Sequence, residues 1–277
     1  MIEFFKMSGS GNDFILIDNR EGALSSIKNI PSFVEAICRR KVSVGADGVI
    51  LVERSPRADF QWRFFNADGS EVEMCGNGGR CVARFAYLKG IAGERMSFET
   101  VAGLIDAELR GDDVKLRLTE PSSLQANQPI PVGDEILTVD SLNTGVPHVV
   151  AFVEELDGFD VFRYGRALRY AEAFQPAGTN ANFVTVTSLH NLSVRTYERG
   201  VEDETLACGT GSVASALAAA ARGLVESPVE VTVRSGERLK IHFERIDGAF
   251  RNVYMEGRVR VIYEGRLWEE AWQENGN

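Results

Sequence analysis

Two cysteines of the 277-residue chain each stand directly before a glycine-rich turn that opens into a helical pattern. Cys208 precedes Gly209-Thr210-Gly211-Ser212, and the Ala-rich stretch that follows predicts a helix ending near Gly223. A thiol at a helix N-terminus faces free backbone N–H groups and the positive end of the helix dipole, which favours the thiolate over the thiol. We therefore expect Cys208 to be reactive, with neighbouring amides free to bind a carboxylate.

The same arrangement occurs earlier in the chain. Cys75 precedes Gly76-Asn77-Gly78-Gly79, and a helical pattern over residues 82–89 ends at Gly90. The two cysteines are 133 residues apart (208 − 75), about half the chain, and an acidic loop precedes each of them. Two similar halves that each carry an activated thiol suggest one active site built at their junction.

The other two cysteines, Cys38 and Cys81, lie inside helical patterns and are expected to be core residues. Cys75 and Cys81 could form half of a metal site, but zinc ligands are spaced more tightly and no Cys/His pair completes the set, so no metal is expected. A phosphate-binding loop is disfavoured because no Gly-Lys-Ser/Thr ending follows the glycine turns. His148 follows a proline and precedes a predicted strand, where a structural and a functional role are equally open.

Composition limits the classes of function. Hydrophobic residues make up 44% and charged residues 25% of the chain, which is typical of a globular protein. The net charge of −10 argues against binding to a nucleic-acid backbone. No apolar run is long enough to cross a membrane, and the N-terminus lacks the layout of a signal peptide. Four cysteines in such a chain indicate free thiols in a reducing cytoplasm.

The predicted elements must position both thiols. Strand-like runs follow one another in each half around one dominant helix, which favours an α+β fold with a strongly curved, mostly antiparallel sheet around a central helix over a doubly wound fold. The Ala-rich helix is apolar or small on nearly all sides and is expected to be buried. A polar, Pro-rich stretch at residues 120–131 suggests a linker. We expect an N-terminal half at 1–119, with 264–277 packed back on it, and a C-terminal half at 120–263.

Several stretches, in this order, resemble the diaminopimelate epimerase family and cover most of the chain up to the Ala-rich helix. The two cysteine motifs together are highly specific, whereas any other stretch alone would be weak. The matching stretches are Gly11-Asn12-Asp13-Phe14, Gly45-Ala46-Asp47-Gly48, Phe65-Asn66-Ala67-Asp68-Gly69-Ser70, Met74-Cys75-Gly76-Asn77-Gly78-Gly79-Arg80-Cys81, Pro147-His148, Asn180-Ala181-Asn182-Phe183, Tyr197-Glu198-Arg199-Gly200 and Ala207-Cys208-Gly209-Thr210-Gly211.

The resemblance implies a two-domain, pseudo-symmetric fold with the active site in the cleft between the domains. It implies a cytoplasmic enzyme that interconverts LL- and meso-2,6-diaminoheptanedioate on the route to lysine and peptidoglycan. It also implies a homodimer that uses neither pyridoxal phosphate nor a metal and whose partner is a small-molecule substrate.

The resemblance also implies roles for individual residues. Cys75 and Cys208 are the acid–base pair, and His148 and Glu198 support the reaction near the reacting carbon. The implied substrate-binding residues are Asn12, Asn66, Gly76, Asn77, Asn180, Glu198, Arg199, Gly209 and Thr210. One position departs from the family, because Val146 stands where many members have an Asn before the Pro-His pair. Asn143 or Thr144 could supply that contact.

Two alternatives remain open at this point. One is a proline racemase-like or phenazine-biosynthesis-like isomerase of the same broad fold, although those relatives lack the full Cys75 motif or replace one thiol. Efficient racemisation of proline would favour it. The other is a non-catalytic thiol-rich or metal-binding protein, which stoichiometric zinc in the purified protein would favour.

Overall fold

The computed structural model describes residues 1–273, which fold into two compact units. Unit 1 contains Met1–Leu116 and the C-terminal segment from Gly257, and unit 2 contains Arg117–Glu256. The units divide three and seven residues earlier than the boundaries expected after residues 119 and 263. Of the C-terminal segment expected to pack on the first half, residues 274–277 lie outside the described residues.

Unit 1 combines short helices with a sheet. Its elements, in chain order, are β1 (Ile2–Gly9), β2 (Asn12–Asp18), α1 (Ile30–Cys38), β3 (Gly48–Glu53), β4 (Phe60–Asn66), β5 (Glu71–Val72), α2 (Gly76–Leu88), β6 (Arg95–Thr100), β7 (Gly103–Arg110), β8 (Asp113–Arg117), β18 (Arg260–Leu267) and the 3₁₀ turn η2 (Glu269–Ala271).

Unit 2 is built from the same kinds of element, short helices and a sheet. Its elements are β9 (Ser122–Val132), β10 (Glu135–Asn143), β11 (Pro147–Phe152), α3 (Val161–Arg169), the 3₁₀ turn η1 (Glu172–Phe174), β12 (Asn180–Ser188), β13 (Asn191–Glu198), β14 (Asp203–Thr205), α4 (Gly209–Ala221), β15 (Val229–Thr232), β16 (Arg238–Ile246) and β17 (Ala249–Arg258).

The strands of the two units pair in the same succession and with the same senses. In unit 1, β1 and β2 are antiparallel, β2 and β3 are parallel, and β3 and β4 are antiparallel; β4 then pairs antiparallel with β5 and parallel with β6. In unit 2, β10, β11, β12, β13, β14 and β15 repeat this succession. Strand β18 lies antiparallel to β1 as β9 does to β10, so these two strands are equivalent. The expectation of an α+β fold with two similar halves is confirmed.

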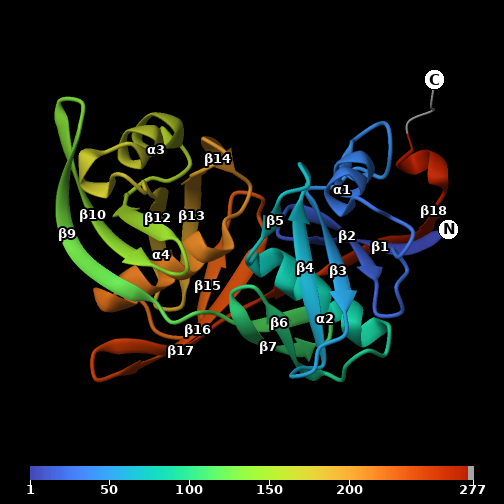
Figure 1. Ribbon diagram of the computed structural model, residues 1–277. Helices are drawn as coiled ribbons and strands as arrows, with labels where there is room; N and C mark the ends of the chain where they lie inside the picture. The colour runs from blue at the N-terminus through green and yellow to red at the C-terminus, as the bar shows by residue number, and fades with distance from the viewer. Residues whose placement is uncertain (274–277) are drawn as a thin grey trace. The chain divides into compact units, whose positions relative to one another are not determined.

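One helix in each unit is surrounded by strands (Figure 1). Helix α2 contacts β1, β2, β3 and β7, and α4 contacts β10, β11, β12, β13, β15 and β16. Every residue from Gly211 to Ala220 in α4 is buried, as the sequence predicts. Because most of these side chains are methyl groups, strands that carry Val184, Val231 and Ile241 pack closely around the helix. Among the residues described, no helix is long and apolar enough to cross a membrane.

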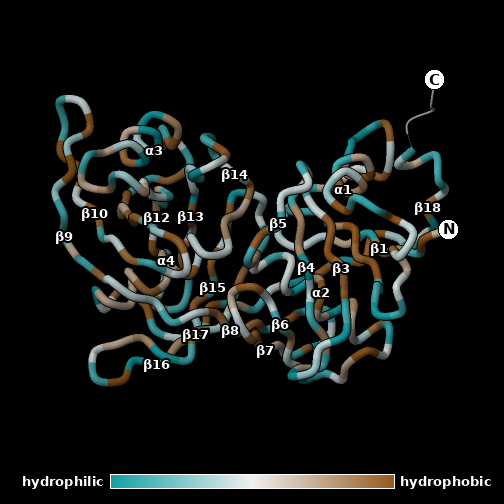
Figure 2. The backbone as a smooth tube through the Cα atoms, viewed as in Figure 1, coloured by the Kyte–Doolittle hydropathy of each residue, from teal (hydrophilic) through white to brown (hydrophobic). Residues whose placement is uncertain are grey.

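The predicted linker is wrong, because residues 122–132 form strand β9, which pairs antiparallel with β10. Most of β9 is exposed and hydrophilic (Figure 2), so the sequence lacks the apolar alternation that identifies a half-buried strand. Pro129 and Pro131 fit because a strand at the edge of a sheet can lack N–H donors on its open side. Only Ile130 and Val132, near the end of the strand, join the core.

Candidate active site

Cys75 is the N-cap residue of α2. Its backbone is extended, with φ −144° and ψ 119°, and the amide of Gly78 donates a hydrogen bond to Sγ over 3.5 Å. A Cβ atom on Gly79 would lie 2.9 Å from Leu116 Cδ2, so a side chain at this position would have to displace the end of Leu116. The sulfur therefore lies where backbone N–H groups at the start of a helix stabilise negative charge.

Cys208 occupies the equivalent position in unit 2. It caps α4 with φ −122° and ψ 110°, and 7% of its surface is exposed. Its Sγ lies 3.6 Å from the hydroxyl oxygen of Thr210. A Cβ atom on Gly211 would lie 3.2 Å from Sγ and 2.3 Å from Asn182 Oδ1, so a side chain at this position would force Asn182 or the helix start to move.

A chain of amide hydrogen bonds fixes Asn12 and Asn77 beside the Cys75 turn. Asn12 Nδ2 donates to Asp47 Oδ2 over 3.1 Å, and Asn77 Nδ2 donates to Asn12 Oδ1 over 2.7 Å. The fully buried Arg80 donates to Asn77 Oδ1 over 2.7 Å, which fixes the second amide as well. Since Asp47 can only accept, both amide orientations are determined.

The charges around Asp13 hold this part of unit 1 together. Asp13 forms ion pairs with the buried Lys6 at 2.8 Å and with Arg40 at 2.6 Å. Burial alone would raise the pKa of Asp13, but hydrogen bonds from Arg40 and Lys6 outweigh it and lower the pKa below its usual value. The backbone amide of Asp13 also donates to Asp47 Oδ2, the oxygen that orients Asn12.

Asn66 lies at the end of β4, directly opposite Gly48 in the ladder between β3 and β4. Its Nδ2 donates to Ser70 Oγ over 3.3 Å. The next backbone amide, of Ala67, donates to the carbonyl of Asp47 over 3.0 Å. Unit 1 therefore brings Asn66 to the Asp47 segment that also orients Asn12.

His148 lies beneath the Cys208 turn in unit 2. Its Nε2 is 3.0 Å from Thr210 Oγ1, and its Nδ1 is 3.2 Å from Asn182 Nδ2. Only 1% of its surface is exposed, and burial together with the charge of Arg199 lowers its pKa to about 3. The ring is therefore neutral at physiological pH.

The remaining predicted residues of unit 2 lie at the ends of β12 and β13. Asn180 Nδ2 donates to the carbonyl of Pro147 over 3.0 Å, and the backbone amide of Arg199 donates to Asn180 Oδ1 over 2.9 Å. The guanidinium of Arg199 donates to the carbonyl of Ala177 over 2.9 Å. Burial raises the pKa of Glu198 above its usual value. Asn180 therefore links the segment before His148 to the Glu198-Arg199 pair.

We call the residues around Cys75 in unit 1 and those around Cys208 in unit 2 the two half-sites. They share a further feature. In each unit, the residue two positions after the cysteine is hydrogen-bonded by a side chain from the beginning of the second strand of the repeat. Asn12 of β2 binds Asn77, and His148 of β11 binds Thr210. The structure thus groups the predicted residues into two equivalent sets, one in each unit.

Val146 stands where many family members have an Asn, and Thr144 and Asn143 are the nearby residues that could replace that Asn. Thr144 Oγ1 donates to the carbonyl of Thr210 over 3.1 Å, so Thr144 contacts the Cys208 turn directly. Asn143 Oδ1 instead accepts from the amide of Gly145 over 2.9 Å. Of the two residues that could replace the missing Asn, Thr144 is therefore the one that reaches the half-site.

Sequence reasoning assigned no role to Asp47, Arg80 or Asn182, although each orients a predicted site residue. A usable pattern existed for Asn182. Asn180 and Asn182 are two apart on one strand and so share a face, which predicts a polar pair in an otherwise apolar strand. The register that brings Asn182 to His148 could not be read from that pattern.

The remaining thiols lie in the core. Cys38 is buried in α1, and burial raises its pKa to about 12. Cys81 is fully buried in α2. The raised pKa keeps the Cys38 thiol protonated, as expected for a structural cysteine.

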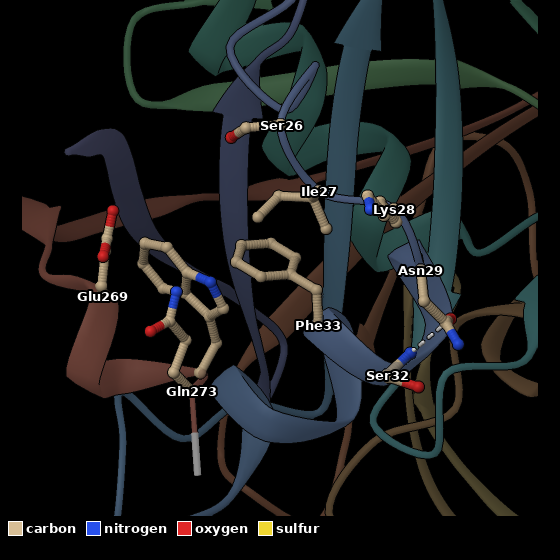
Figure 3. A pocket seen from close by; sticks show the side chains of 9 residues that line it. Ser26, Ile27, Lys28, Asn29, Ser32, Phe33, Glu269 and Gln273 are labelled. Carbon is tan, nitrogen blue, oxygen red and sulfur yellow. Dashed lines mark hydrogen bonds between the residues drawn. The ribbon is translucent and has the colours of Figure 1, made fainter. Parts of the chain in front are cut away.

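A pocket of about 330 Å³ in unit 1 is separate from these half-sites. Figure 3 shows Ile27 and Phe33 facing Glu269 and Gln273 across it. The dashed bond in the figure is the N-cap of α1, in which Asn29 Oδ1 accepts from the amide of Ser32. None of the predicted site residues lines this pocket.

Solved structures with the same architecture define the class of fold. A phenazine biosynthesis protein of the PhzF family from Bacillus anthracis superposes with a TM-score of 0.72 at 16% identity, over 96% of this chain and 99% of that one. A probable proline racemase from Agrobacterium radiobacter, solved with bound carbonate, gives 0.68 at 15% identity, over 97% of this chain and 93% of that one. The chain therefore has the two-repeat α+β fold of these proteins.

Sequence comparison is more specific than the fold. The family model for diaminopimelate epimerase matches residues 4–124 and 141–262. The diaminopimelate epimerase of Aquifex aeolicus is 48% identical over 98% of this chain and 99% of its own length, and that of Archaeoglobus fulgidus is 42% identical over 96% of each. The chain belongs to the diaminopimelate epimerase family, whose members are isomerases.

Proposed function

We propose that this protein interconverts LL- and meso-2,6-diaminoheptanedioate by moving the proton on one α-carbon, with Cys75 and Cys208 as the acid–base pair. One observation carries the proposal. Both thiols cap helices that begin with glycine turns, at equivalent positions of the two repeats. Membership in an epimerase family supports proton transfer as the reaction of this pair of thiols.

Inverting an α-carbon requires removal of a proton from one face and delivery of a proton to the other. A thiolate takes the first proton and a thiol gives the second, and the two exchange roles in the reverse direction. Negative charge develops on the substrate carboxylate as the proton leaves. The amides of Gly76 and Asn77 in one unit, and of Gly209 and Thr210 in the other, are the donors for that charge. The proposal therefore needs neither a metal nor pyridoxal phosphate.

Both ends of this substrate carry an ammonium and a carboxylate, so the distal end needs partners of both signs. In our proposal Arg199 binds the distal carboxylate and Glu198 the distal ammonium. Asn12, Asn66 and Asn180 each offer a donor and an acceptor, which suits a group with both functions. His148 supports the reaction near the reacting carbon.

Family membership also suggests the setting. We propose a homodimeric cytoplasmic enzyme on the route to lysine and peptidoglycan precursors, with a small molecule as its only substrate partner. Light scattering on the purified protein tests the dimer, since a monomeric mass at micromolar concentration would contradict it.

The activity is tested by incubating reduced, EDTA-treated protein with LL-2,6-diaminoheptanedioate and separating the stereoisomers by chromatography. We expect the meso form to accumulate up to equilibrium. L-Proline in a parallel reaction should remain unracemised, because it has no distal end for Glu198 and Arg199 to bind. Racemisation of proline without conversion of the diamino acid would contradict the proposal and favour a proline racemase-like activity.

A further inference from the structure

The hydrogen bonds around Asn182 determine which atoms carry protons. The carbonyl of Val149 can only accept, and Asn182 Nδ2 lies 2.8 Å from it, so this atom is the amide nitrogen. Thr196 Oγ1 donates to Asn182 Oδ1 over 2.9 Å, which agrees with the same orientation. The amide nitrogen has two hydrogens, and the second points to His148 Nδ1 at 3.2 Å.

The state of the histidine ring follows from that contact. Because Nδ1 of His148 accepts from Asn182, it carries no proton, and a neutral ring then carries its proton on Nε2. This N–H donates to Thr210 Oγ1 at 3.0 Å. Since the Thr210 oxygen accepts there, its own hydrogen is available for Cys208 Sγ at 3.6 Å, a normal distance for a hydrogen bond to sulfur.

We propose that Asn182 is a positioning residue that holds His148 as the Nε2–H tautomer, so that the Thr210 hydroxyl donates its hydrogen to the Cys208 sulfur and favours the thiolate. We call this chain of hydrogen bonds, from Asn182 through His148 and Thr210 to Cys208, the relay. Its role in catalysis rests on the proposed function. The relay itself is a property of unit 2 alone. In it, His148 serves as a hydrogen-bond donor and is not the base that deprotonates Cys208.

Packing keeps every member of the relay in place. Asn182 is fully buried, and only 1% of His148 and 3% of Thr196 is exposed, so water does not compete for the bonds that Asn182 makes to these two residues. Gly211, in the first turn of α4, has no Cβ and so allows Asn182 Oδ1 to approach the helix. Thr144 Oγ1 also donates to the carbonyl of Thr210, which fixes the backbone that carries the hydroxyl.

The equivalent position of unit 1 lacks such a hydroxyl. Asn77 replaces Thr210 there, and its amide group is bound by Asn12 and Arg80. The surroundings of the two sulfurs therefore differ in their side-chain hydrogen-bond donors, although the two helices are equivalent. This difference makes the relay testable, because the pH dependence of Cys75 serves as an internal reference when Thr210 is changed.

The first test reads the tautomer directly by ¹⁵N NMR of histidine-labelled, substrate-free protein. We expect His148 to show a protonated Nε2 and an unprotonated Nδ1 between pH 6 and 8. In Asn182→Asp the carboxylate can only accept from the ring, so Nδ1 should gain a proton. An Nδ1–H ring in the parent protein, or an unprotonated Nδ1 in Asn182→Asp, would overturn the proposal.

The second test measures how the alkylation rate of each cysteine by iodoacetamide depends on pH, with the modified peptides identified by mass spectrometry. We expect Thr210→Val to raise the apparent pKa of Cys208 by about one pH unit, because a hydrogen bond to the charged sulfur is lost. Thr210→Ser keeps the hydroxyl and should leave that value unchanged. The value for Cys75 should stay constant in both variants.

A matched control removes a different hydroxyl from α4, that of the buried Ser215. Ser215 Oγ donates to the carbonyl of Gly211 over 2.7 Å and does not contact the relay, so Ser215→Ala should not change the titration of Cys208. Equal titrations for Thr210→Val and Thr210→Ser would overturn the relay. Neither test uses turnover, so failure of the proposed function would appear separately, as a correct tautomer and titration in a protein that does not convert the substrate.

Discussion

At the scale of single residues, the two thiols at the helix starts differ from the two in the core. Cys75 and Cys208 cap α2 and α4, whereas Cys38 and Cys81 are buried inside helices. The cysteine motifs made this division predictable, because a cap residue before a glycine turn is visible in sequence. The partners of each site residue were not predictable, since Asp47 and Asn182 reach Asn12 and His148 only through the register of paired strands.

Replacing either cap thiol should abolish the reaction, because in the proposed mechanism each serves one face of the substrate carbon. We expect Cys75→Ala and Cys208→Ala to lower kcat by at least about 10³-fold, with circular dichroism unchanged. Cys38→Ala is the matched control and should keep most of the activity. Near wild-type turnover by either cap variant, measured by chromatography of the stereoisomers, would refute the two-thiol mechanism.

The neutral His148 makes stability depend on pH. Its pKa is about 3 in the folded protein against a usual 6.5, so below pH 6.5 the unfolded chain binds a proton that the folded chain refuses. The free energy of unfolding should therefore fall as the pH is lowered from about 6.5 towards 3, by at most about 1.4 kcal/mol per pH unit from this group. Urea unfolding of the parent and of His148→Asn measures this, and equal slopes for the two proteins would refute it.

At the scale of elements, the start of α4 combines a cap, a tight turn and a close approach to β12. The Ala-rich composition predicted a buried helix, and its surroundings confirm that prediction. Strand β9 was not predictable, because its exposed residues and its two prolines resemble a loop until the pairing with β10 is known. Local propensity therefore identified the elements whose burial pattern is regular and missed the edge strand.

Gly211→Ala tests the close approach at α4. The new Cβ would lie 2.3 Å from Asn182 Oδ1 and 3.2 Å from Cys208 Sγ, so either the helix start or Asn182 must move. We expect a loss of about 1–3 kcal/mol in the free energy of unfolding and a strong loss of turnover. Gly158→Ala is the control, because its Cβ would meet nothing closer than 3.9 Å. Similar behaviour of the two variants in thermal unfolding and turnover would argue against this packing.

At the scale of the whole chain, the spacing of the cysteine motifs predicted two similar halves, and the matching strand pairings confirm them. The pairing of β18 with β1 was difficult to predict from the sequence, because it joins the two ends of the chain. Its last residue, Leu267, pairs with Ile2 and is 2% exposed in the core of unit 1. Long-range pairing of this kind depends on tertiary context that no local pattern contains.

The closing strand should contribute to the stability of unit 1. Leu267→Ala removes a buried side chain and leaves a cavity, so we expect a loss of about 2–4 kcal/mol in the free energy of unfolding. Val261, on the same strand, is 37% exposed, and Val261→Ala should cost much less. Denaturant titration followed by tryptophan fluorescence compares them, and equal losses would show that β18 does not close this core.

The claim that two thiols act on one carbon is tested most directly by early turnover in deuterium oxide. If separate groups remove and deliver the proton, the meso product formed in the first few per cent of reaction should carry deuterium at the inverted carbon. The remaining LL substrate should carry almost none, because a thiol that has just taken the substrate proton returns that same proton. Mass spectrometry of the separated stereoisomers measures both. Equal deuterium in the product and the remaining substrate at that stage would indicate a single base and contradict the account.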